Sequence, residues 1–142
     1  MARTPSNMIP LGTKAPHFEL IDTKDNILKS LNSLKGEKAT VIMFICNHCP
    51  FVIHVNPEIT KLAKDYVNQG VNCIAISSND TDNYPQDRPE LMQQVAAQED
   101  YIFPYLYDSD QKVAKSYDAA CTPDFYLFNS DLELVYRGQL DS

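Results

Sequence analysis

The sequence predicts a mixed α/β domain in which a central β-sheet is flanked by helices. Two β-branched apolar runs, at 40–45 and 71–77, have the composition of strands buried on both faces. A stretch of helical periodicity lies between them, so the three segments form a strand–helix–strand crossover whose strands pair in parallel. A turn-forming cluster at 129–131 separates two further apolar runs, which predicts an antiparallel hairpin.

The chain is predicted to begin with an extended arm over residues 1–15, which contains two prolines. A short strand over 18–21 and a polar turn over 22–26 follow. Residues 30–34 are expected to form a single helical turn that Gly36 closes.

The helix after strand 40–45 is predicted from apolar residues at helical spacing between Val55 and Val67, with Gly70 as its C-terminal stop. Pro57 is expected to kink this helix, because proline removes a backbone donor and clashes with the preceding turn.

The second half continues the alternation of helices and strands. Pro89 stands where a first helical turn tolerates proline, which predicts a helix over 89–99. A short apolar piece at 105–107 precedes another helix, for which Asp110 is the expected cap. The hairpin strands are predicted at 125–128 and 132–136.

Length and charge bound the function. The 142 residues fit one domain spanning 1–142, and 12 Lys and Arg against 19 Asp and Glu give a net charge of -7. This charge disfavours nucleic acid and anionic lipid as partners. The sequence has neither an apolar run of signal-peptide length at its N-terminus nor a membrane-spanning stretch, so we expect a cytoplasmic location without membrane association.

The chemistry is predicted to reside in the dithiol Cys46-Asn47-His48-Cys49, which directly follows a buried strand. Cysteines three apart at a helix start lie on one face of its first turn, where they can form a reversible disulfide. The positive end of a helix lowers a cysteine pKa from ~8.5 into the range ~3.5–7.5. Cys46 is the expected attacking thiolate and Cys49 the resolving thiol, while protonated His48 adds a positive charge that favours thiolate.

The remaining cysteines are Cys73 and Cys121. A structural zinc site would usually need a second close pair, and these two are far apart in the sequence, so no metal is expected. Cys73 lies in the predicted apolar strand at 71–77 and is expected to have a structural role. The redox reaction itself needs no cofactor.

Three further segments accompany the dithiol: 15–20 with the sequence Ala-Pro-His-Phe-Glu-Leu, 30–36, and Thr122-Pro123 followed by the apolar strand at 125–128. With these segments the chain resembles the thioredoxin-like superfamily, in its branch of AhpC/TSA proteins and thiol-disulfide oxidoreductases. The resemblance implies a thioredoxin fold, a cis bond between Thr122 and Pro123, and a substrate-binding role for both residues. It would also bring Cys121 near the dithiol as a third thiol, although a small buried filler explains Cys121 equally well.

The chain departs from this family pattern in several ways. A peroxiredoxin would carry Pro-x-x-x-Thr-x-x-Cys, where this chain has Ile42 and Cys46 in the Pro and Thr positions, which disfavours dedicated peroxidase chemistry. Thioredoxins usually place a buried carboxylate six residues before the first cysteine, at the position of Thr40 here. Proton transfer is then expected to use His48, water or another acid.

A C-terminal helix normally follows the last strand of this fold, but the sequence ends at Ser142, so we expect this helix to be missing. The sheet face that it would cover needs another cover, and a second subunit in a homodimer would supply one.

The expected function is that of a thiol-disulfide oxidoreductase that acts on protein or small-molecule thiols and disulfides and is restored by a cellular thiol reductant. One alternative is a thiol peroxidase in which Cys49 becomes a sulfenic acid that Cys46 or Cys121 resolves. Another is a copper or iron–sulfur carrier built on the same thiolates.

Overall fold

A computed structural model describes residues 11–45, 50–78, 88–117 and 124–138. The strands are β1 (Glu19–Asp22), β2 (Ile27–Ser30), β3 (Ala39–Phe44), β4 (Val71–Ser77), β5 (Tyr105–Tyr107), β6 (Asp124–Asn129) and β7 (Leu134–Gly138). The helices are α1 (Leu31–Leu34), α2 (Pro50–Tyr66), the 3₁₀ turn η1 (Val67–Gln69), α3 (Pro89–Gln98) and α4 (Lys112–Ser116).

The strands form one mixed sheet in the order β2-β1-β5-β4-β3-β6-β7. β3 pairs in parallel with β4, and β4 in parallel with β5, as the crossover pattern predicts. β6 runs antiparallel to β3 and forms a hairpin with β7. β3 therefore lies inside the sheet, with β4 on one side and β6 on the other.

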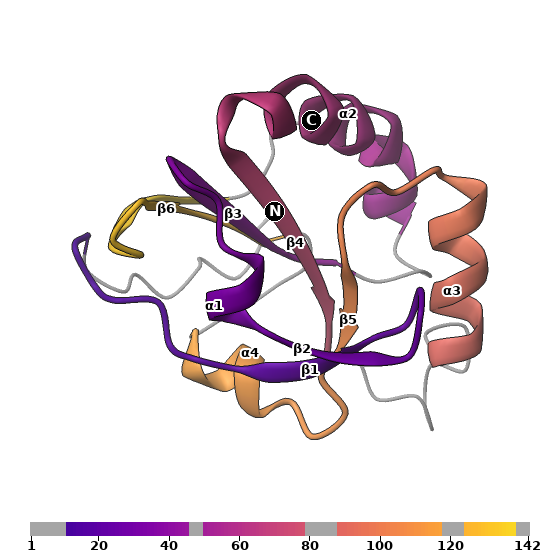
Figure 1. Cartoon of the computed structure of the whole chain (residues 1–142). Coiled ribbons are helices and arrows are strands. Elements are labelled where there is room, and N and C mark those ends of the chain that lie inside the picture. Colours follow the sequence, from indigo (N-terminus) through magenta and orange to yellow (C-terminus); the bar gives the residue numbers. More distant parts are fainter. Residues whose placement is uncertain (1–10, 46–49, 79–87, 118–123, 139–142) are drawn as a thin grey trace, which may run out of the picture.

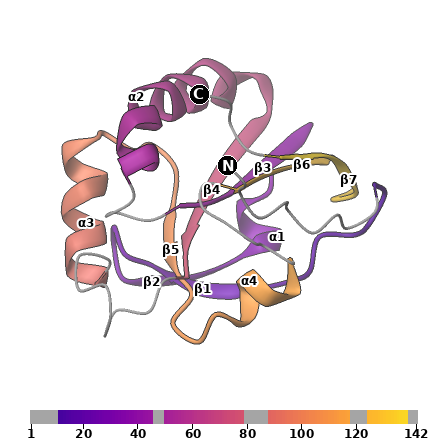
Figure 2. The ribbon, with the colours of Figure 1, turned by 180° about the vertical axis from the view of Figure 1, so that it is seen from behind.

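Helices cover both faces of this sheet (Figures 1 and 2). On one face, α2 and α3 contribute Ile59, Ala63, Met92 and Ala96 to a core that includes Met43 and Ala75. On the other face, α1 and α4 pack with an aromatic group made of Phe18, Phe44, Tyr117, Tyr126 and Phe128. The strands of the parallel pair are buried on both faces, which is why they read as continuous apolar runs.

Several predicted elements are confirmed with small shifts. The helix predicted at 89–99 is α3, with Pro89 in its first turn. Gly70 ends η1 in the left-handed conformation, with a φ of 84°. The hairpin strands lie at β6 and β7, but the turn between them covers residues 130–133 and is longer than predicted. Leu132 in this turn adopts a left-handed φ of 60°.

Other expectations need correction. β2 is not among the predicted strands; it is short and has exposed Ile27 and Leu28. The expected cap Asp110 accepts the Lys112 N–H at the start of α4, at 3.1 Å, but the N-cap residue is Gln111. The two carboxylate oxygens of Asp108 accept the N–H groups of Val113 and Ala114, at 3.3 and 2.9 Å.

Gly36 is needed for close packing and does not close α1, whose C-cap is Lys35. A Cβ at position 36 would come within 3.0 Å of backbone atoms of Ala39, Gly70 and Asn72. The expected helical turn at 30–34 is otherwise confirmed, because Ser30 and Ser33 form a reciprocal capping box at the start of α1.

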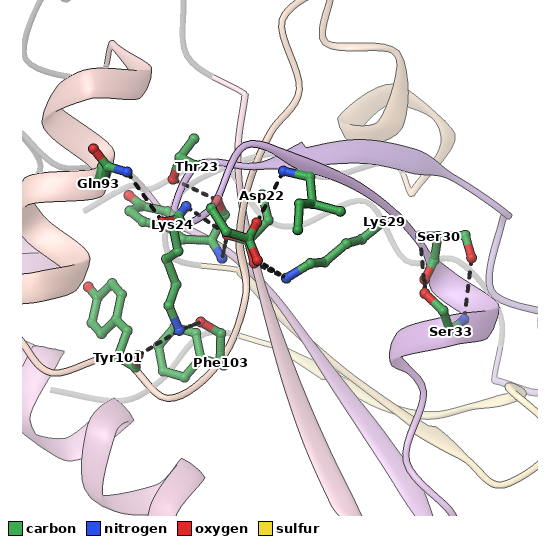
Figure 3. A network of polar contacts seen from close by, with 12 residues as sticks. Asp22, Thr23, Lys24, Lys29, Ser30, Ser33, Gln93, Tyr101 and Phe103 are labelled. Atoms are coloured by element: carbon green, nitrogen blue, oxygen red, sulfur yellow. Dashed lines mark hydrogen bonds and ion pairs between the residues drawn. The ribbon is translucent and has the colours of Figure 1, made fainter.

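A polar network ties the β1–β2 hairpin to β5 and α3 (Figure 3). The buried Asp22 carboxylate accepts from the Lys29 ammonium at 2.7 Å and from the Tyr105 N–H at 3.2 Å. The Lys24 ammonium donates to the carbonyl oxygens of Tyr101 and Phe103, at 2.9 and 3.2 Å. The network fixes the edge of the sheet farthest from β6.

An apolar groove of about 440 Å³ remains between α2 and the sheet beside β6 and β7. Ile59, Leu62 and Tyr66 of α2 form one wall, and Phe125 and Tyr136 lie opposite. Among the described residues, this groove leaves part of one sheet face uncovered. Residues 139–142 lie outside the described residues, so the missing helix itself stays a prediction.

None of the helices in the described residues is both long and apolar enough to cross a membrane.

Candidate active site

The dithiol segment lies between β3 and α2 in the sequence. β3 ends at Phe44, and the N–H of the next residue, Ile45, donates to the carbonyl of Ile76 at 3.0 Å. α2 begins at Pro50, directly after Cys49 in the sequence. Cys46, His48 and Cys49 lie outside the described residues, so their own geometry stays a prediction.

The electrostatics of α2 favour an anion at its N-terminus. The helix has 17 residues, and its first turn carries no acidic side chain. Its first backbone N–H groups have no partner within the helix, and its dipole adds positive potential there. A thiolate on the residues just before Pro50 would be stabilised by both effects.

The start of β6 lies at the same edge of the sheet as the end of β3. The two strands are antiparallel, and Asp124, the first residue of β6, pairs with Phe44. The chain that enters β6 and the chain that leaves β3 therefore meet the sheet at one place. Cys121, Thr122 and Pro123 come directly before β6 in the sequence, but they lie outside the described residues.

A rigid aromatic group supports this edge. The ring of Phe44 lies 5.7 Å from that of Tyr117 and 5.8 Å from that of Tyr126, measured between centroids. Tyr117 and Tyr126 are themselves 5.7 Å apart and meet edge to face. All three side chains are buried, so the end of β3 packs into the core on this face of the sheet.

Two buried polar side chains lie on the strands that flank the end of β3. Asp124 on β6 is fully buried, and its Oδ2 accepts from the Tyr126 hydroxyl at 3.3 Å. Ser77 on β4 is also fully buried, and its hydroxyl has no hydrogen-bond partner among the described residues. Polar groups are rarely buried without a role in structure or function, which draws attention to this edge.

Asp124 was not among the residues predicted for the site, although its sequence position carries a signal. Buried and half-buried residues alternate along β6, and Asp124 falls in phase with the buried residues Tyr126 and Phe128. Alternate side chains of a strand point to the same face, so a carboxylate in phase with core residues is expected to point into the interior as well.

Two other residues singled out from the sequence have structural roles. Thr40 lies in the first half of β3, where its Oγ1 accepts the Gly36 N–H at 3.0 Å. Thr40 occupies the position of the thioredoxin acid, but its side chain is a hydroxyl engaged in this hydrogen bond and not a carboxylate, so it does not replace that acid. Cys73 is a free, buried thiol on β4, and burial raises its pKa to about 11, so it is poorly suited to thiolate chemistry.

In the described part of the chain, no group of three His, Cys, Asp or Glu side chains could hold a metal ion. The cysteines of the copper or iron–sulfur alternative lie outside that part, so that alternative is untested.

The model of the AhpC/TSA family matches residues 11–137, which is most of the sequence. The chain belongs to the AhpC/TSA family. Within this family it is 29% identical over 125 residues to the thiol-disulfide oxidoreductase ResA of Halalkalibacterium halodurans. The match covers 87% of this chain but only 65% of that relative.

Solved structures agree with this assignment. A conserved, uncharacterized protein of Geobacillus kaustophilus is 59% identical and superposes with a TM-score of 0.93, over 96% of this AhpC/TSA chain and 72% of that one. The thioredoxin domain of a thiol-disulfide oxidoreductase from Bacteroides vulgatus superposes with a TM-score of 0.77 at 19% identity, over 92% and 89% of the two chains. The fold is therefore the thioredoxin fold, and the predicted family is confirmed.

Proposed function

We propose that this AhpC/TSA protein is a thiol-disulfide oxidoreductase that exchanges a Cys46–Cys49 disulfide with partner thiols. The observation that carries the proposal is the placement of α2, a 17-residue helix without acid in its first turn, directly after a Cys-x-x-Cys that follows a buried strand. The likeness to ResA supports it.

The reaction proceeds in two exchanges. The Cys46 thiolate attacks one sulfur of a partner disulfide, forming a mixed disulfide while the other partner sulfur leaves as a thiolate and takes up a proton. The Cys49 thiol then loses its proton and attacks the Cys46 sulfur. This step forms the Cys46–Cys49 bond and releases the second partner thiol. A cellular thiol reductant supplies two electrons and two protons to restore the dithiol.

His48, Thr122 and Pro123 have supporting roles in this proposal. Protonated His48 favours the thiolate over the disulfide. Thr122 and Pro123 directly precede β6 in the sequence, and their backbone would pair with an extended substrate. The partners are protein or small-molecule thiols and disulfides, and the cytoplasm is the expected location.

Insulin reduction by dithiothreitol tests the proposal. The wild type should accelerate precipitation of the insulin B chain, and Cys46→Ser should abolish the acceleration because it removes the attacking sulfur. Cys73→Ser is the matched control and should retain activity, since Cys73 is buried away from solvent. Equal rates for the wild type and Cys46→Ser would contradict the proposed role of Cys46.

The same preparations separate the alternative chemistries. Stoichiometric consumption of peroxide with a sulfenic acid trapped at Cys49 would favour the peroxidase. Copper or iron–sulfur content in protein purified without chelator would favour the carrier.

We also propose that the protein forms a homodimer. The apolar groove beside β6 and β7 supports this, because Tyr66 and Tyr136 at its rim are 42% and 56% exposed. Each copy would thus offer both a groove and an aromatic side chain able to enter the groove of the other copy.

A further inference from the structure

We draw no further inference here: the strongest candidate, the apolar groove between α2 and the sheet beside β6 and β7, carries nothing beyond the homodimer already proposed, because nothing in the described part of the structure shows what covers it.

Discussion

The behaviour of the cysteines depends on their surroundings more than on their number. Cys73 is a free thiol with a 7% exposed side chain, and burial raises its pKa from the ordinary value of 9.0 to about 11. The proposed active thiols stand instead before the positive end of a long helix, which acts on pKa in the opposite direction. From the sequence alone, a buried structural cysteine and a reactive cysteine can be told apart only by the strands and helices predicted around them.

This difference makes a prediction for alkaline pH. The Cys73 thiol stays protonated in the folded chain between pH 9 and about 11, whereas it ionises in the unfolded chain. Its contribution to stability is therefore fully present below pH 9 and is lost as the pH rises through this window. This loss in the free energy of unfolding is on the order of 2–3 kcal/mol.

Urea unfolding of the wild type and Cys73→Ala at pH 8 and pH 11 measures this loss. The destabilisation on raising the pH should be smaller in Cys73→Ala, and equal losses would contradict the assignment.

At the scale of elements, the sequence identified those that carry their own pattern. β3, β4 and α3 follow from apolar runs and from a proline at a helix start. The short strand β2 was missed because its residues are exposed or half-buried and it exists through pairing with β1. Asp110 was expected to cap α4 and does accept the Lys112 N–H, but local spacing does not reveal that Asp108, just after β5, accepts the next two helix amides.

The β1–β2 hairpin gives the prediction at this scale. Asp22→Asn removes the negative charge that binds Lys29 at 2.7 Å while keeping an oxygen for the backbone N–H groups. The free energy of unfolding should fall by about 1–3 kcal/mol, the usual effect of losing a hydrogen bond to a charged group in a buried place. Asp25→Asn is the matched control, because Asp25 binds the same ammonium from the surface, where ion pairs contribute little. Urea unfolding that ranks the two variants equally would show that the hairpin does not depend on the buried charge.

At the scale of the whole molecule, the mixed sheet and the thioredoxin fold were predictable because the dithiol, the crossover and the hairpin are each local signals in the sequence. The convergence of β3 and β6 at one edge was expected from the family resemblance. The burial of Asp124 there was missed, since it follows from pairing between residues 80 positions apart. Long-range pairing of this kind is what a pattern along one chain conveys least well.

The groove beside β6 and β7 provides the last prediction. If two copies cover each other there, the protein should sediment with twice the 16.1 kDa mass of the chain. Tyr136→Lys should shift it toward the monomer, because a charge at the groove rim would have to be desolvated in the dimer. Val135→Lys is the matched control: the neighbouring side chain is 47% exposed and does not line the groove, so this variant should still dimerise. A wild type that sediments as a monomer at all concentrations would show that this sheet face is covered in another way.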